Sequence, residues 1–230
     1  MRRLFVTGTD TGVGKSTISC ALLAAWRRSG KAVAGFKPIE TGCKAAADGT
    51  LIPEDALRLA RAAGDPAPRP DCCPIRFGVP ASPEAAAKAE ARTIDLGAAD
   101  AAFDRFDAEV VLIEGAGGLL VPIGADLTMA DLAKRWGATL LIVARASLGT
   151  INHTLLTIEA AQRRGLHISG VVLNRTNPPG PDDADNADAI RRHGRVPVLG
   201  TFPLLPEASF ERLADLAERS LDLQALWNAI

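Results

Sequence analysis

The residues best suited to chemistry lie near the N-terminus, in the run GTDTGVGKS at residues 8–16. This glycine-rich turn separates an apolar stretch expected to form a strand, residues 4–6, from a stretch expected to form a helix, residues 15–28. Successive backbone N–H groups in such a turn can point at phosphate oxygens, and the helix N-terminus adds partial positive charge. The pattern therefore predicts a site for the phosphates of a nucleotide.

Two side chains complete this phosphate-binding loop, or P-loop. Lys15 is expected to reach the β- and γ-phosphates, and the Ser16 hydroxyl is expected to ligate Mg²⁺. In the usual spacing four residues separate a first glycine from the Gly-Lys pair; here Thr9 takes the place of that glycine and Gly8 lies one residue earlier. A chance glycine-rich turn between a strand and a helix is the alternative, and nucleotide binding is favoured over it.

A second candidate is the run KPIETG at residues 37–42, which ends the second expected strand. The carboxyl ends of neighbouring parallel strands share one crevice, so Lys37 and Lys15 are expected to face the same phosphates. A solvated lysine at a strand end is the alternative. Pro38 and Gly42 indicate a turn that gives the Thr41 hydroxyl a defined direction, either toward a substrate or as a turn cap, and both interpretations stay open.

A third candidate is Glu114, which ends the apolar run VVLIE and precedes the glycine-rich run GAGG. A strand-end acid in this position is typical of a Walker-B strand, whose carboxylate lies beside the bound metal. A strand-end acid on a plain turn is the alternative. Because Mg²⁺ prefers oxygen ligands with one or two carboxylates, a second acid is plausible, and Asp55 is the candidate. By itself, Asp55 also fits ordinary first-turn helix charge.

A fourth candidate is Asn174, which ends the apolar run VVLN. Its amide offers both a donor and an acceptor, which suits the edge of an adenine ring. A strand-end asparagine that starts a turn is an equally good interpretation of the pattern.

Strand and helix patterns alternate along most of the chain. Continuous apolar runs without alternation favour strands that are buried on both faces, as in a parallel sheet. Strands are expected at residues 4–6, 32–36, 110–113, 139–144, 168–173 and 198–202. Helices are expected at residues 15–28, 54–63, 95–106 with Asp95 as N-cap, 129–135, 152–164 and 211–229. Residues 43–82 otherwise look irregular, and residues 177–185 are expected to form a surface loop. The sequence predicts an α/β fold, a doubly wound, mostly parallel sheet in a single P-loop domain over residues 1–230.

Charge and cysteine content limit the class of protein. The 26 basic and 27 acidic residues leave a net charge of −1, so neither a nucleic-acid nor an anionic-membrane partner is expected. No apolar run approaches the roughly 20 residues that span a bilayer. Cys20, Cys43, Cys72 and Cys73 form no CxxC pair, and the adjacent pair is a poor disulfide candidate. We therefore expect four free thiols and a cytoplasmic protein.

Taken together, the runs GTDTGVGKS, KPIETG, IEGAGG and VVLN, in this order, resemble the dethiobiotin synthetase family from Leu4 to about Pro206. The resemblance implies ATP as co-substrate, Mg²⁺ as cofactor, 7,8-diaminononanoate and CO₂ or bicarbonate as substrates, and a homodimer. The implied reaction closes a cyclic urea through a carbamate and a carbamic–phosphoric anhydride, without a protein nucleophile.

The resemblance also implies roles for individual residues. Lys37 and Lys15 are the expected catalytic residues, and the expected metal ligands are Ser16, Asp55 and Glu114. The expected nucleotide contacts are Gly12, Val13, Gly14, Lys15, Ser16, Thr17, Asp55, Glu114, Gly115, Ala116, Gly117, Asn174, Arg175, Phe202, Pro203 and Leu204. The expected substrate contacts are Thr11 and Thr41, together with Gly149, Thr150 and Asn152 in a turn that meets the neighbouring subunit.

Three rival functions fit this sequence less well. A partitioning or septum-placement ATPase carries a second lysine early in the P-loop, where this chain has Asp10. A cobyrinate synthase of the amidotransferase type needs an additional glutaminase domain, for which 230 residues leave no room. A nucleotide-binding module without catalysis does not explain Lys37 and Thr41 in one motif.

Overall fold

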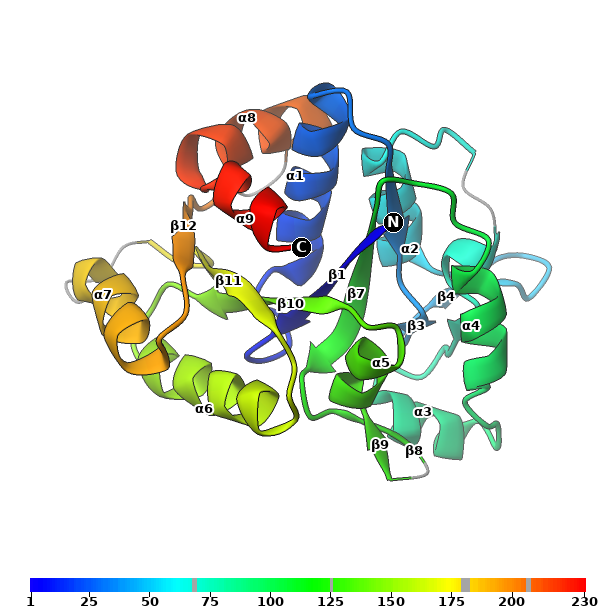
Figure 1. The fold of residues 1–230 in the computed structure, drawn as a ribbon. Coiled ribbons are helices and arrows are strands. Elements are labelled where there is room, and N and C mark those ends of the chain that lie inside the picture. The colour runs from blue at the N-terminus through cyan, green and yellow to red at the C-terminus, as the bar shows by residue number, and fades with distance from the viewer. Residues whose placement is uncertain (68–69, 125, 179–182, 206–207) are drawn as a thin grey trace.

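Six parallel strands form the central sheet of the computed structural model, which describes residues 1–67, 70–124, 126–178, 183–205 and 208–230 (Figure 1). The strand order is β12-β11-β10-β1-β7-β2. Their bounds are β1 (Arg2–Gly8), β2 (Val33–Phe36), β7 (Val110–Gly118), β10 (Thr139–Arg145), β11 (Ile168–Asn174) and β12 (Val198–Phe202). The chain starts in β1, builds one half of the sheet with β2 and β7, and then adds β10 to β12 on the other side. The predicted doubly wound parallel sheet is confirmed.

The apolar runs form strands because each strand is covered on both faces. In β10, Leu140 and Ile142 pack into the core on one face, and Leu141 and Val143 pack into the core on the other. All four side chains are fully buried. Since successive side chains of a strand point to opposite faces, only a continuous apolar run can fill both cores at once.

Helices cover the two faces of the sheet (Figure 1). One face is covered by α1 (Lys15–Arg28), α2 (Glu54–Ala62), α8 (Phe210–Ser220) and α9 (Leu223–Ala229). The other is covered by α3 (Pro83–Ala89), α4 (Leu96–Phe103), α5 (Met129–Arg135), α6 (Thr150–Arg163) and α7 (Asp183–Gly194). Helices α3 and α7 were not predicted. The Asp95 cap of α4 is confirmed, since its side chain accepts from the backbone N–H groups of Gly97 and Ala98, but the helix ends earlier than predicted.

The prediction of one helix over residues 211–229 is wrong, because the chain breaks at Leu221 and Asp222. Leu221 is extended and forms an isolated bridge with Gly200 of β12. The Asp222 N–H donates to the Leu199 carbonyl at 2.7 Å, and its side chain caps α9. Hydrogen bonds to the edge strand therefore replace the next helical turn.

The segment over residues 43–82 is more ordered than predicted. It contains β4 (Lys44–Ala45), β5 (Leu51–Ile52), a 3₁₀ turn (Pro70–Cys72) and β6 (Ile75–Arg76), which pairs in parallel with β3 (Ile39–Glu40). The Lys37 N–H donates to the Cys72 carbonyl at 3.0 Å, and the Phe77 N–H donates to the Glu40 carbonyl at 2.9 Å. The segment therefore holds the backbone of the KPIETG turn. A further small hairpin joins β8 (Pro122–Gly124) to β9 (Leu127–Thr128).

Two other predictions concern the chain's surface and its cysteines. Part of the predicted loop at 177–185 lies outside the described residues, and α7 already begins at Asp183. Within the described ranges, no helix combines the length and the apolar character needed to cross a membrane. The predicted free thiols are confirmed: all four cysteines are buried and unpaired, and burial raises the pKa of Cys43 and Cys72 to about 11.

Candidate active site

A cavity of about 380 Å³ opens where β1, β2 and β7 end, between the P-loop, the KPIETG turn and the start of α2. It gathers residues that are far apart in the chain, as expected for the carboxyl edge of a parallel sheet. Its lining residues are Thr11, Gly12, Gly14, Lys15, Ser16, Thr17, Lys37, Glu40, Thr41, Asp55, Glu114, Gly115, Ala116 and Gly117.

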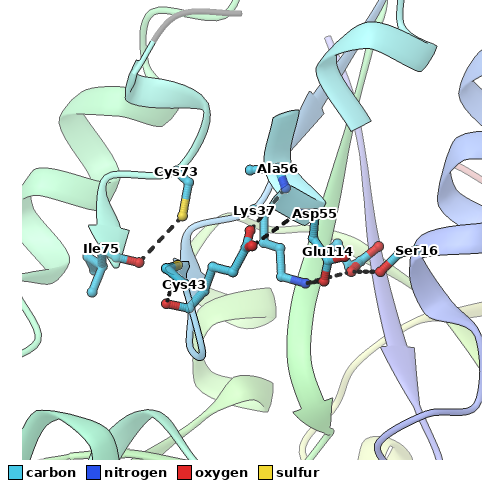
Figure 2. A network of polar contacts seen from close by, with 9 residues as sticks. Ser16, Lys37, Cys43, Asp55, Ala56, Cys73, Ile75 and Glu114 are labelled. Carbon is cyan, nitrogen blue, oxygen red and sulfur yellow. Dashed lines mark hydrogen bonds and ion pairs between the residues drawn. The ribbon is translucent and has the colours of Figure 1, made fainter. Parts of the chain in front are cut away.

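Lys37 lies at the centre of the polar network in this cavity (Figure 2). Its ammonium group donates to Glu114 Oε1 at 2.9 Å and forms a second ion pair with Asp55. The Ser16 hydroxyl donates to the same Glu114 oxygen at 2.7 Å. Lys37 is buried, and Glu114 is fully buried. The structure thus brings together Lys37 and the three predicted metal ligands.

The charges of this network follow from its contacts. Burial by itself lowers the pKa of Lys37, but the carboxylates of Glu114 and Asp55 raise it further than burial lowers it. Burial by itself raises the pKa of Asp55, and the contact with Lys37 brings it below its usual range. Burial lowers the pKa of Lys15, and the positive charge of Lys37 lowers it further. At neutral pH an ionised Asp55 therefore faces a protonated Lys37.

One oxygen of Glu114 indicates what the cavity can hold. Glu114 Oε2 is buried and has no hydrogen-bond partner among the described residues. A buried carboxylate oxygen without a partner is unfavourable, so a cation at this position would stabilise it. The donors here are two carboxylates and a hydroxyl, and such oxygen ligands match the preference of Mg²⁺. The residues fit a magnesium ion.

The P-loop is held by contacts that the sequence did not predict. The Arg145 guanidinium, at the end of β10, donates to Asp10 Oδ2 and to the Thr11 carbonyl, each at 3.0 Å. Gly12 and Gly14 have φ of +72° and +95°, in the left-handed region that favours glycine. The ion pair between Asp10 and Arg145 thus fixes the first residues of the P-loop against β10. Asp10 stands where the partitioning ATPases carry a lysine.

The residues predicted to bind adenine lie together at the ends of β11 and β12, outside the lining of the cavity. The Asn174 amide donates to the Val13 carbonyl at 2.9 Å, which ties β11 to the P-loop. The Arg175 N–H donates to the Phe202 carbonyl at 3.0 Å. The side chains of Val13 and Phe202 are fully buried in the core, so neither side chain is open to a ligand. Pro203 is half-buried and Leu204 is exposed.

The turn with Gly149, Thr150 and Asn152 also lies outside the cavity, at the start of α6. Gly149 is the N-cap with φ of +89°, and no side chain caps the helix. Thr150 is buried with its hydroxyl 3.5 Å from that of Thr154, whereas Gly149 and Asn152 are exposed. Only the latter two are open to a partner.

Similarity to known proteins shows the family of this chain. A family model described as an AAA domain matches residues 2–212. A protein of Anaeromyxobacter sp. strain K named ATP-dependent dethiobiotin synthetase is 50% identical over all of this chain and 98% of its own length. A protein of the same name from Bacillus licheniformis is 37% identical over 99% of this chain and 97% of its own. The chain belongs to the dethiobiotin synthetase family. The resemblance seen in the four sequence motifs is therefore confirmed.

Solved structures show how widely this family's fold is shared. FtsY, a cell division protein of Thermotoga maritima, aligns with 99% of this chain and 67% of its own at a TM-score of 0.52 and 18% identity. Chloroplast FtsY of Physcomitrella patens aligns with 99% of this chain and 64% of its own at a TM-score of 0.51 and 17% identity. These similarities support the α/β fold of the dethiobiotin synthetase family and say nothing of its reaction.

Glu40 is the lining residue that the sequence analysis missed. Its carboxylate accepts from the backbone N–H groups of Asp55 and Ala56, each at 3.0 Å. Burial raises the pKa of Glu40, although Lys37 and the two N–H groups oppose that shift. The sequence does show an acid between Lys37 and Thr41. The N–H groups of Asp55 and Ala56 that this acid binds lie 15 and 16 residues away, however, and no local pattern marks them.

The contact between Asn174 and the P-loop predicts different costs for two glycine substitutions. A Cβ on Gly14 would lie 2.0 Å from the Asn174 amide nitrogen, whereas a Cβ on Gly12 would meet nothing within 4 Å. Both residues have positive φ, so both variants carry the backbone strain of about 1–3 kcal/mol. We expect Gly14→Ala to lower the free energy of unfolding more than Gly12→Ala, as measured by urea denaturation. In an Asn174→Ala background, the difference in unfolding free energy between the two glycine variants should become smaller. Equal losses of unfolding free energy for Gly12→Ala and Gly14→Ala would contradict the close contact between Gly14 and Asn174.

Proposed function

We propose that this chain catalyses the ATP- and Mg²⁺-dependent ring closure of 7,8-diaminononanoate with CO₂, which yields dethiobiotin, ADP and phosphate. One observation carries the proposal: Lys15, Lys37 and the Ser16–Asp55–Glu114 oxygen set line one cavity in a chain of the dethiobiotin synthetase family. Relatives across its full length are named for ATP-dependent formation of dethiobiotin. Four buried free thiols support a cytoplasmic location.

The nucleotide is bound by the P-loop in this proposal. Backbone N–H groups from Gly12 to Thr17 and the N-terminus of α1 face the phosphates, and Lys15 adds its charge to them. The side chains of Ser16, Asp55 and Glu114 hold Mg²⁺. The metal, when bound, neutralises negative charge on the phosphates. Adenine is bound by the backbone around Asn174, Arg175, Phe202, Pro203 and Leu204. This region then has two roles, because Asn174 also donates a hydrogen bond to the P-loop.

The chemistry needs positioning and charge more than it needs a protein nucleophile. One amine adds to CO₂ and loses a proton, which gives a carbamate. A carbamate oxygen attacks the γ-phosphorus, ADP leaves, and a carbamic–phosphoric anhydride results. The second amine attacks the carbonyl carbon, phosphate leaves with the electrons of the C–O bond, and a second proton is released. Lys37 and Lys15 face the negative charge that develops on the transferring group. Thr11, Thr41 and the backbone of residues 115–117 line the space for the diamine.

The alternative, a partitioning or septum-placement ATPase, is not favoured. Asp10 replaces the second lysine of that class and is held in an ion pair by Arg145. The family to which the chain belongs is also a different one.

The direct test is product formation. The purified protein is incubated with 7,8-diaminononanoate, bicarbonate, ATP and Mg²⁺, and dethiobiotin is measured by mass spectrometry together with ADP. We expect equal amounts of the two products. ADP release that does not depend on the diamine, with no dethiobiotin, would point to the ATPase alternative.

Lys37→Met tests the catalytic lysine. Turnover is expected to fall by about 10²–10³, since one charge that faces the reacting phosphoryl group is lost. Lys37 is also the partner of buried Glu114, so we expect the metal-free variant to lose about 3–5 kcal/mol of stability. Thermal melts with Mg²⁺ and ATP would establish that the variant is folded under assay conditions. Lys44→Met, the same change at an exposed ion pair with Glu54, is the control. Near-normal turnover of Lys37→Met would remove Lys37 from the mechanism.

Glu114→Gln tests the metal site. The amide keeps the shape of the side chain but removes the charge that attracts the cation. We expect the half-saturating Mg²⁺ concentration at fixed ATP to rise by about tenfold or more, while metal-free nucleotide affinity changes less. Glu54→Gln makes the same change on the exposed first turn of α2 and should leave the titration unaltered. An unaltered titration for Glu114→Gln would indicate a purely structural acid.

We further propose a homodimer in which the turn at the start of α6 completes the partner's substrate site. Leu148 beside this turn is 88% exposed, and Leu156 of α6 is 57% exposed. Leu156 lines one cleft together with Leu120, which is 46% exposed, and exposed apolar side chains gathered in this way are typical of interfaces. A cleft of about 420 Å³ runs from the P-loop past residues 118–122 to Leu156 and its neighbours on α6. Diaminononanoate has its carboxylate far from its amines, and the N-terminus of a partner's α6 suits a carboxylate.

Asn152→Asp tests the shared site, because it places a like charge beside the bound carboxylate. We expect a raised KM for 7,8-diaminononanoate with an unchanged KM for ATP, measured by steady-state kinetics. Asn228→Asp, on the distant helix α9, is the matched control. A chain that sediments as a monomer at assay concentration and keeps full activity would rule the shared site out.

A further inference from the structure

Helix α2 starts without a cap of its own. Pro53 occupies its N-cap position and makes no side-chain cap hydrogen bond. A serine or aspartate at that position would accept from the N–H group of the second or third helical residue, which here are Asp55 and Ala56. Since proline offers no acceptor in its side chain, these two N–H groups need a partner from elsewhere.

Glu40 supplies that partner from the KPIETG turn. Its Oε1 accepts from the Asp55 N–H and its Oε2 accepts from the Ala56 N–H, each at 3.0 Å. The residue is only 7% exposed. Its own backbone is held in turn, because the Glu40 carbonyl accepts from the Phe77 N–H at 2.9 Å.

We propose that Glu40 is a positioning residue, whose carboxylate caps α2 and thereby sets Asp55 opposite Lys37 and Ser16. Figure 2 shows Asp55 and Ala56 at the start of this helix, with Asp55 directed toward Lys37. The proposal rests on the metal site proposed above, and it assigns to Glu40 a role that involves neither metal nor substrate.

Two features favour a cap over a ligand. Each Glu40 oxygen already accepts from a backbone N–H group at the start of the helix, so the carboxylate is engaged by α2 through both oxygens. A negative charge at the N-terminus of a helix is also favourable in itself. The Glu40 cap sets one partner of the Lys37–Asp55 ion pair, and Lys37 itself lies three residues earlier in the same turn. One turn therefore positions both ends of that pair.

The test moves the cap to its usual place. Glu40→Ala removes the acceptor, and Pro53→Ser added to it restores an acceptor for the same N–H groups. We expect Glu40→Ala to raise the half-saturating Mg²⁺ concentration by about 10- to 100-fold, as for other residues that orient metal ligands. The double variant should recover most of that loss, and Pro53→Ser alone should resemble the wild type. Glu40→Gln, which keeps one acceptor oxygen, should lie between wild type and Glu40→Ala.

Two results would overturn the proposal. One is an unaltered Mg²⁺ titration for Glu40→Ala. The other is a folded double variant that recovers nothing, which would assign the effect to the charge of Glu40 itself. Amide hydrogen exchange at Asp55 and Ala56 supplies a readout that needs neither metal nor activity: it should accelerate in Glu40→Ala and slow again in the double variant. That readout separates a failed cap from a failed metal site, since it applies even to a chain that makes no dethiobiotin.

Discussion

The candidate site depends on one buried ammonium group, that of Lys37, held between two carboxylates. Taking a lysine and Glu114 out of water is costly, and the cost is offset only if the charges meet with good geometry. Here Glu114 comes from β7, Asp55 from α2 and Ser16 from the start of α1. The two ion pairs therefore join the turn after β2 to β7 and to α2, and the hydrogen bond from Ser16 adds the start of α1. The sheet order places β2 and β7 side by side. Displacement of the turn after β2 away from β7 would leave the buried charges of Lys37 and Glu114 without each other, which makes the arrangement of the site part of the stability of the fold.

The parallel sheet explains why these groups meet at all. All six strands run in the same direction, so the loops after β1, β2 and β7 emerge at one edge. The P-loop follows β1, the KPIETG turn follows β2, and Glu114 lies within β7. Two further contacts tie the P-loop to the other half of the sheet, through Arg145 at the end of β10 and Asn174 at the end of β11. The loop is thereby fixed from both sides, which suits a site that must bind phosphate without rearranging.

Sequence reasoning succeeded where the signal is local or follows from the sheet. The apolar run over β10 predicts a strand buried on two faces, and the parallel order then predicts that Lys15 and Lys37 share one crevice, as their places in the cavity lining show. It failed where a distant partner decides the structure. The tail helix breaks because Asp222 bonds to β12, and α2 is capped by a glutamate 15 residues before Asp55. The amide of Asn174 was interpreted from its chemistry alone, and its contact with Val13 has no signal in either segment. The alternative of a solvated Lys37 at a strand end is wrong for the same reason, because its buried partner Glu114 lies far away in the sequence.

Lys37 and Lys15 lie in opposite electrostatic environments in this cavity. Lys37 has a carboxylate on either side, which outweighs its burial and keeps it charged. Lys15 is buried as well, yet in the described part of the chain no ion pair involves its ammonium group, and burial dominates. A positive charge without a close counter-ion gains more from an incoming phosphate than one that is already paired. Nucleotide binding would therefore draw most on Lys15. In the proposed mechanism, Lys37 would exchange one set of oxygens for another as charge develops on the transferring group, so its contribution would be greatest in the transition state.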